Sequence, residues 1–289
     1  MGMMMSLMFL ALLAPQKPSP IGMVLQAEGA VFVERASVRT PAKLADLLFP
    51  GDRIVTTTGQ ATFFFCPSNE RANVKNGATV ELNAGAMVTR AGAAPTRTPA
   101  RCSLPKVELG AENLERVGAL RARGDPPISI YVGGPITTGR PTFEWASLPG
   151  AVSYQLVVSD PAGTPIWQQR SSTASMVYPQ NVPALKDGAY RWDLRAEVDG
   201  KLAGQQSAAF EVKSNAALAA PSGDDVASHL SRAFELEDAG YFAEAAAHFR
   251  AIQKSDPADT RIARRLVMLY RSAGLNAAAA ELAEKNNIK

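Results

Sequence analysis

The spacing of apolar residues differs between the two ends of this chain, and this difference constrains the fold more than any other feature. From Ile21 to about Arg90, and again from Ile128 to about Val212, short apolar runs of period two are separated by turn-forming residues, which is typical of β-strands. From residue 225 to residue 289 the apolar residues instead follow helical spacing. One core does not suit both patterns, so we expect a multidomain chain with all-β domains followed by an all-α segment.

The length of 289 residues agrees with this division, because single domains usually hold about 100–150 residues. Lys and Arg number 30 and Asp and Glu number 27, which leaves a net charge of only +3. Such a balance gives no signal for binding nucleic acid or an acidic membrane surface. We therefore expect no nucleic-acid partner.

The chain opens with an uncharged apolar run at residues 3–14, which is followed by Pro15, Pro18 and Pro20. The run suits the core of an export signal and is too short to cross a bilayer core of about 30 Å. We predict that residues 1–20 are a signal peptide or an N-terminal anchor and that the protein is periplasmic or secreted. Contact with a membrane is expected only through this segment, if it is not cleaved.

Cys66 and Cys102 are the only cysteines. An even number in an exported chain favours a disulfide between them, and two buried thiols are the alternative. Two cysteines without a nearby histidine do not make a zinc site, so we expect no metal.

The first β segment, residues 21–95, has short apolar runs between turn residues. The turn Pro50-Gly51-Asp52 leads into Ile54-Val55-Thr56 and then into an apolar strand around Phe63. This stretch resembles the core of the FecR-type β domain, which implies an all-β domain. FecR proteins are membrane-spanning regulators that act on sigma factors. Because the chain lacks the internal spanning helix of that family, signalling is kept only as an alternative function.

Residues 96–126 are predicted to connect this domain to the next one. The small, basic, proline-rich residues 91–101 are expected to form a loop or linker. Apolar residues at helical spacing predict a short helix over residues 108–123, which Gly124 and Pro126 would end.

The second β segment, residues 127–213, has six or seven short strands, which suits an immunoglobulin-like sandwich. Its stretches Phe143-Glu144-Trp145 and Leu185-Lys186-Asp187-Gly188-Ala189-Tyr190 resemble those of a fibronectin type III domain. In that family the tryptophan packs in the core and the tyrosine forms a corner. The resemblance implies that Trp145 is buried and that Tyr190 is the corner residue.

Residues 214–224 are rich in Ala, Ser, Gly and Pro and are predicted to be a flexible linker. The last segment, residues 225–289, breaks at Ser255-Asp256-Pro257 and resembles a pair of tetratricopeptide repeats, the second cut short. The resemblance rests on small residues that recur at a 34-residue period, namely Gly240 and Gly274, and Ala245 and Ala279.

No residue set is typical of an active site. Nucleophilic catalysis requires a base within hydrogen-bond reach, and the only histidines, His229 and His248, fall in the predicted repeat helices. We expect them to be ordinary helix-surface or groove residues. Glu235, Glu237 and Asp238 are expected to form a solvated helix face. The chain is therefore predicted to have no catalytic residue and no cofactor.

Arg261, Arg264, Met268 and Arg271 share one face of a predicted helix. In the tetratricopeptide family these positions line the concave groove, which implies a groove that meets an acidic peptide or a carboxylate. Arginine suits that partner because its planar guanidinium binds a carboxylate through two hydrogen bonds. The alternative is a solvent-facing helix whose arginines serve solubility.

Two repeats alone leave an apolar end uncovered, because about three are normally needed for a stable stack. We expect this end to dock on a partner, on itself or on the sandwich domain. The residues involved are Phe234, Leu236, Leu266, Val267 and Leu269.

Together these features predict a non-enzymatic exported protein that binds and scaffolds a protein or peptide partner in the cell envelope, and an acidic peptide is one candidate partner. A second hypothesis is that the β domains bind a cell-wall glycan or peptidoglycan. Trp167 is then the candidate exposed aromatic.

Overall fold

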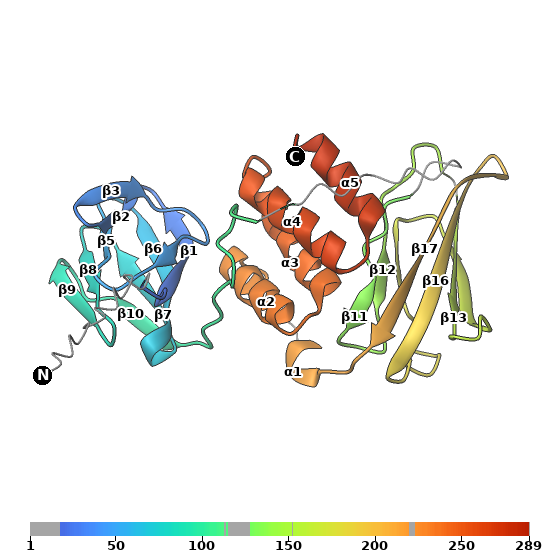
Figure 1. Cartoon of the computed structure of the whole chain (residues 1–289), viewed down its shortest axis with the longest axis horizontal. Helices are drawn as coiled ribbons and strands as arrows, with labels where there is room; N and C mark the ends of the chain where they lie inside the picture. Colours follow the sequence, from blue (N-terminus) through green and yellow to red (C-terminus); the bar gives the residue numbers. More distant parts are fainter. Residues whose placement is uncertain (1–17, 113, 115–127, 152, 220–222, 289) are drawn as a thin grey trace, which may run out of the picture.

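The computed structural model describes residues 18–112, 114, 128–151, 153–219 and 223–288. Its three parts lie in a different order in space from their order in the sequence. The helices come last in the chain, yet they lie between the N-terminal β domain and the second β domain (Figure 1). The chain is a multidomain protein of β and α parts, as the periodicity predicts.

The N-terminal β domain consists of two five-stranded sheets, with the strand orders β10-β7-β6-β1-β4 and β3-β2-β5-β8-β9. All neighbouring strands are antiparallel. The strands are β1 Gly22–Glu28, β2 Val31–Arg35, β3 Val38–Pro41, β4 Leu47–Leu48, β5 Arg53–Thr56, β6 Gln60–Phe65, β7 Glu70–Lys75, β8 Thr79–Leu82, β9 Met87–Ala91 and β10 Thr96–Pro99.

The Gly-Asp turn before β5 is fixed by a buried carboxylate. Asp52 is 1% exposed, and its carboxylate accepts hydrogen bonds of 2.8 Å from the backbone N–H of Phe49 and from the Arg35 guanidinium. A buried carboxylate requires such partners. The turn is therefore tied to β2, the strand that ends at Arg35.

Three consecutive phenylalanines in β6 show how this domain joins the rest. Successive side chains of a strand point to opposite faces of the sheet, so a sheet with one wet face buries only alternate residues. Phe63, Phe64 and Phe65 are all at most 3% exposed. Phe63 and Phe65 belong to the domain's own core, whereas Phe64 belongs to the larger core that includes the helices. Both faces of this sheet are therefore covered.

The second β domain is a sandwich in which a five-stranded sheet, of order β11-β17-β16-β13-β14, packs against the pair β12 and β15. Trp192 is fully buried at its centre and donates a hydrogen bond of 3.0 Å from Nε1 to the carbonyl of Val132. The strands are β11 Gly134–Ile136, β12 Thr142–Glu144, β13 Ser153–Ser159, β14 Pro165–Ser171, β15 Ser175–Val177, β16 Gly188–Val198 and β17 Lys201–Val212.

Both residues that the fibronectin resemblance points to lie as expected. Trp145 is 3% exposed, and its ring centroid is 5.3 Å from that of Tyr154. The Tyr190 hydroxyl donates a hydrogen bond of 3.0 Å to the carbonyl of Lys186, four residues upstream. This bond closes the corner before β16.

The helical segment contains two successive helix pairs. The steps from Val226 to Thr260 and from Phe242 to Asn276 are each 34 residues, so the second pair repeats the first. Gly240 and Gly274 occupy equivalent turns with φ of +86° and +76°, where glycine is favoured. The helices are α1 Ala216–Ala219, α2 Val226–Asp238, α3 Phe242–Ser255, α4 Thr260–Ser272 and α5 Asn276–Lys285.

Two predicted loops contain regular structure. Residues 91–101 include β10, which pairs antiparallel with β7. Residues 214–224 include α1, and the backbone N–H of Asn215 donates a hydrogen bond of 3.0 Å to the carbonyl of Thr137. Both predictions rested on composition and were wrong, because backbone pairing does not depend on apolar side chains.

Two other predictions fall mainly outside the described residues. These are the apolar run at residues 3–14 and the connector helix over residues 108–123. The described part of that predicted helix, residues 108–112 and 114, is not helical. Within the part of the chain that the structure describes, no helix is long and apolar enough to cross a membrane.

Candidate partner-binding site

An extended segment, Lys106–Glu112, lies between the N-terminal β domain and the helices, and we call it the strap. Figure 1 shows it in green beside α2 and α4. Leu109 and Glu112 are buried at 4% and 3% exposure, whereas Val107 and Glu108 are exposed. The strap therefore contacts the helices through a few side chains and turns the others to solvent.

Arg265 of α4 holds the strap at two points. Its Nη2 donates a hydrogen bond to the carbonyl of Val107, and its Nε lies 2.9 Å from Oε1 of Glu112. Its Nη1 donates a hydrogen bond of 3.0 Å to Glu237 of α2. The side chains of Arg265 and Glu112 are both 0% exposed. A fully buried guanidinium is thus shared by two carboxylates, one from the strap and one from the helices.

Two of the predicted groove arginines also face the strap. Arg264 donates a hydrogen bond of 3.0 Å to the carbonyl of Glu112. Arg261 pairs with Asp259, the N-cap of α4, at 2.7 Å and reaches Asp46 of the N-terminal β domain at 3.3 Å. The predicted face therefore does meet carboxylates, and they belong to the same chain.

The other two predicted groove residues lie elsewhere. Met268 packs against the larger hydrophobic core, and Arg271 lies in the last turn of α4. Arg265 was missed, although the sequence holds a signal for it. It falls at helical spacing between Ile262 and Leu269 on the apolar face, where a charge requires buried partners.

The acids of α2 are not a fully solvated face. Asp238 is 63% exposed and pairs with Lys106 of the strap at 2.6 Å. Glu235 pairs with Arg232 at 2.9 Å with only 14% of its side chain exposed. Burial raises the pKa of Glu237, although the neighbouring Arg265 favours its charged form. The predicted solvated face is therefore wrong for Glu235 and Glu237.

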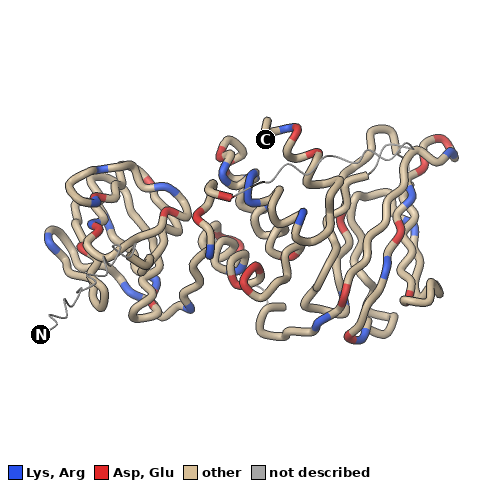
Figure 2. Tube along the Cα trace, viewed as in Figure 1, with Lys and Arg blue, Asp and Glu red and all other residues tan. Residues whose placement is uncertain are grey.

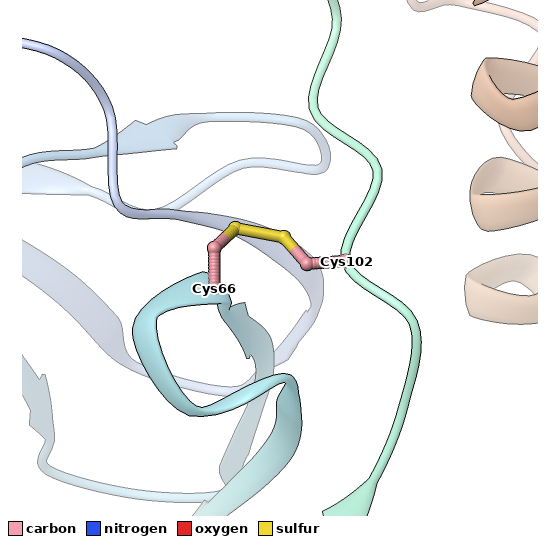
Figure 3. The surroundings of a disulfide bond; sticks show 2 residues. All are labelled: Cys66 and Cys102. Carbon is pink, nitrogen blue, oxygen red and sulfur yellow. A yellow bond between two sulfur atoms is a disulfide. The ribbon is translucent and has the colours of Figure 1, made fainter.

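The disulfide anchors the start of the connector. The structure pairs Cys66, after β6, with Cys102, as the sequence predicts, with 5.2 Å between the two Cα atoms (Figure 3). Cys102 precedes the strap by four positions, so the strap leaves the β domain from a covalently fixed point. The loop spans 36 residues, and its closure is expected to stabilise the fold by about 3–4 kcal/mol. Such bonds are typical of proteins outside the reducing cytosol.

The opposite side of the helices contacts the sandwich domain. Arg250 of α3 pairs with Glu144 of β12, and its guanidinium carbon lies 4.5 Å from the ring centroid of Tyr131. Tyr131 also stacks on Tyr270 of α4 at 5.8 Å. The backbone N–H of Thr137 donates a hydrogen bond of 3.0 Å to Glu244 of α3. The helices are thus held by charged contacts on both sides and by aromatic contacts on the side of the sandwich domain.

The apolar residues expected to lie at an uncovered end of the two repeats are buried. Leu266, Val267 and Leu269 are 0% exposed, and Phe234 and Leu236 are 2% exposed. All five belong to the core that also contains residues of both β domains. Leu236 also lines a cavity together with Tyr131 and Ile136 of the sandwich domain.

A cavity of about 350 Å³ remains between the sandwich domain and α3, lined among others by Arg140, Glu244 and His248. His248 and His229 face each other with 2.9 Å between their Nδ1 atoms. Burial, followed by the nearby His229 and Arg232, lowers the pKa of His248 to about 4. Within the described ranges, no group of three or more His, Cys, Asp or Glu residues is placed to hold a metal ion.

Trp167 does not lie free on the surface as the glycan hypothesis requires. It is half-buried, and its ring centroid lies 5.0 Å from Tyr178 and 6.2 Å from Phe143. The expected exposed aromatic is therefore packed against the sandwich core.

The strand orders and cores define a protein with an N-terminal β domain, a β-sandwich and a helical segment. No family model and no curated protein matches the sequence. Among solved structures, the chain is similar to the crystal structure of FN3tt, with 14% identity and a TM-score of 0.26 over 32% of this chain and 99% of that one.

Two further structures are similar at the same low level. CopC from Methylosinus trichosporium OB3b is 15% identical with a TM-score of 0.23, over 29% of this chain and 85% of CopC. The FMN-binding beta-glucuronidase from Facaelibacterium prausnitzii L2-6 is 11% identical with a TM-score of 0.24, over 67% of this chain and 40% of the enzyme.

Proposed function

We propose that this protein is a non-enzymatic binding and scaffolding protein, exported to the cell envelope, where it mediates protein–protein interaction. The FecR-type and tetratricopeptide resemblances support a multidomain envelope protein of this kind. In this proposal the helical segment fixes the relative position of the two β domains, and partners contact the surfaces that these domains present. The partner classes are proteins or peptides.

The observation that carries the proposal is the placement of the helices between the β domains. Arg261 reaches Asp46 on one side, and Arg250 reaches Glu144 on the other. Charged residues of both signs are spread along the chain in all three parts (Figure 2). This distribution supports a protein that works through extended surfaces.

The junction between α3 and the sandwich offers a direct test. Arg250→Glu places two carboxylates face to face at Glu144, which repel each other and open the junction. We expect the immobilised full chain to retain a specific protein from envelope extracts. The Arg250→Glu variant should retain at least fivefold less of it, because its β domains are no longer held in one arrangement.

Lys254→Glu is the matched control, because Lys254 is an exposed residue of the same helix and the charge change is the same. This variant should retain the partner like the parent chain. Circular dichroism checks that both variants stay folded. The proposal is wrong if the parent chain retains no specific protein, or if Arg250→Glu retains as much as Lys254→Glu.

A further inference from the structure

The strap and the helices form an example of peptide recognition within one chain. Residues 106–112 form neither helix nor strand, and the strap is held by side chains of α2 and α4. Arg265 contacts the carbonyl of Val107 and, five residues later, the carboxylate of Glu112. This arrangement fits an extended segment that offers a backbone carbonyl and a carboxylate at that separation.

The middle of the strap adds a steric requirement. A Cβ on Gly110 would lie 2.9 Å from Cγ of Arg261, and the φ of Gly110 is +92°. Glycine is therefore required for this close approach to α4. Leu109, next to it, is the one strap residue with a buried apolar side chain. The strap thus presents an ordered set of features: carbonyl, leucine, glycine and carboxylate.

The resident strap does not use all of the polar groups of this face. Oε2 of Glu112, Nε of Arg264 and Nε of Arg265 are buried without hydrogen-bond partners. The Arg264 Nε lies 3.9 Å from Oε2 of Glu112, just too far for a hydrogen bond. A carboxylate placed slightly closer to Arg264 would satisfy both atoms. A separate peptide is free to make that adjustment, because no anchored disulfide limits its path.

We propose that the strap is a replaceable resident ligand, and that the face formed by Glu237, Asp238, Arg261, Arg264 and Arg265 binds an extended acidic segment of a partner protein when the strap leaves. This inference rests on the proposed function and names the chemistry of one partner. The recognised segment carries a glutamate at the position of Glu112 and a glycine at the position of Gly110.

Tethering explains why the strap occupies the face in the intact chain. A tethered segment acts at an effective concentration in the millimolar range. The apparent dissociation constant of a free peptide is its intrinsic dissociation constant divided by the fraction of chains whose strap has left the face. The parent chain is therefore expected to bind a free peptide weakly, and a change that weakens only the strap should increase the affinity.

The test uses the full chain and a labelled peptide with the sequence of residues 104–112, blocked at both ends. Binding is measured by fluorescence anisotropy. In Glu112→Gln the strap loses its charge but the face keeps its arginines, so we expect this variant to bind the peptide at least tenfold more tightly than the parent chain. A peptide with glutamine in place of its last glutamate should bind at least tenfold more weakly.

Glu108→Gln is the matched control, because it removes the same charge from an exposed position of the strap. It should bind the peptide like the parent chain. Adding Arg264→Gln to Glu112→Gln should weaken peptide binding again. Arg264 is 31% exposed, and Glu237 keeps its partner Arg265, so the second substitution leaves no buried acid unpaired. Hydrogen exchange of residues 106–112 reports release of the strap.

Two results would overturn the inference. One is that Glu112→Gln binds the peptide no more tightly than Glu108→Gln. The other is that the strap amides stay as protected in Glu112→Gln as in the parent chain. Failure here is separate from failure of the proposed function, because capture of an envelope partner is measured with the strap in place and depends on the junction at Arg250.

Discussion

His248 is a buried side chain that makes the free energy of unfolding depend on pH. Its pKa is lowered from its ordinary value of 6.5 to about 4, first by burial and then by His229 and Arg232. The unfolded chain takes up a proton near pH 6.5, whereas the folded chain does so only near pH 4. The stability that neutral His248 contributes is therefore present above pH 6.5 and is lost as the pH falls toward 4.

We expect the free energy of unfolding to decrease between pH 7 and pH 4.5, and to decrease less in His248→Gln, which has no imidazole to protonate there. Urea unfolding at the two pH values measures both changes. His229→Gln is the comparison, and it should keep most of the pH dependence because burial is the larger cause. An unchanged pH dependence in His248→Gln would show that this histidine is not responsible.

The burial and contacts of single residues were predicted correctly where they depend on residues nearby in the sequence. Trp145 and Tyr190 lie where the fibronectin resemblance implies, since their roles depend on nearby strands and backbone. Trp167 was predicted to be exposed, because the alternation of a strand does not reveal which face meets Tyr178 and Phe143. Arg265 was missed because its partners, Glu112 and Glu237, come from distant parts of the sequence.

At the scale of elements, the turns of the N-terminal β domain allow a matched comparison of two glycines. Gly59 and Gly77 both have positive φ, +86° and +74°. A Cβ on Gly59 would lie 1.9 Å from the carbonyl oxygen of Glu28, whereas nothing lies within 4 Å of a Cβ on Gly77. Alanine is strained at both positions, but it forces the backbone to move only at Gly59.

We therefore expect Gly77→Ala to lower the free energy of unfolding by about 1–2 kcal/mol. Gly59→Ala should lower it by about 3 kcal/mol or more, because strain and a backbone clash act together. Urea unfolding of the two variants gives the difference. Equal losses would mean that the contact between Gly59 and Glu28 relaxes at no cost.

Most strands and the four main helices were predictable because periodicity reports which side chains are buried. The failures at this scale involve backbone contacts. β10 was predicted to be a loop because residues 91–101 lack apolar alternation, yet an edge strand needs only hydrogen bonds to β7. The triple phenylalanine of β6 was a missed signal, since three buried neighbours require a sheet covered on both faces.

At the scale of the whole molecule, the spatial order of the parts was not predictable. Chain order suggests a row of β domain, sandwich and helices, whereas the helices lie in the middle (Figure 1). The long-range pairs that fix this order, such as Arg261 with Asp46, leave no periodic trace in the sequence. The uncovered apolar end expected for two repeats did hint at docking, but it did not distinguish a partner, a second copy and the sandwich domain.

Export and the disulfide are tested together on the intact protein. We expect the mature chain, recovered from an envelope fraction, to lack the apolar run if that run is cleaved and to gain the mass of two hydrogen atoms on reduction. Intact mass spectrometry with and without reductant measures both. A mature mass that does not change on reduction would contradict the bond between Cys66 and Cys102, and recovery only from the cytosol would contradict export.

The distance along the chain between the strap and its helices has a consequence for biosynthesis. Arg264 and Glu112 are 152 residues apart, which corresponds to about 8–30 s of translation at ~5–20 residues per second. During that interval the N-terminal domain has already emerged, but Phe64 and Glu112 have nothing to pack against. A chain that stops before α4 would keep this surface open, so chaperones and proteases are given a physical means of distinguishing unfinished copies from complete ones.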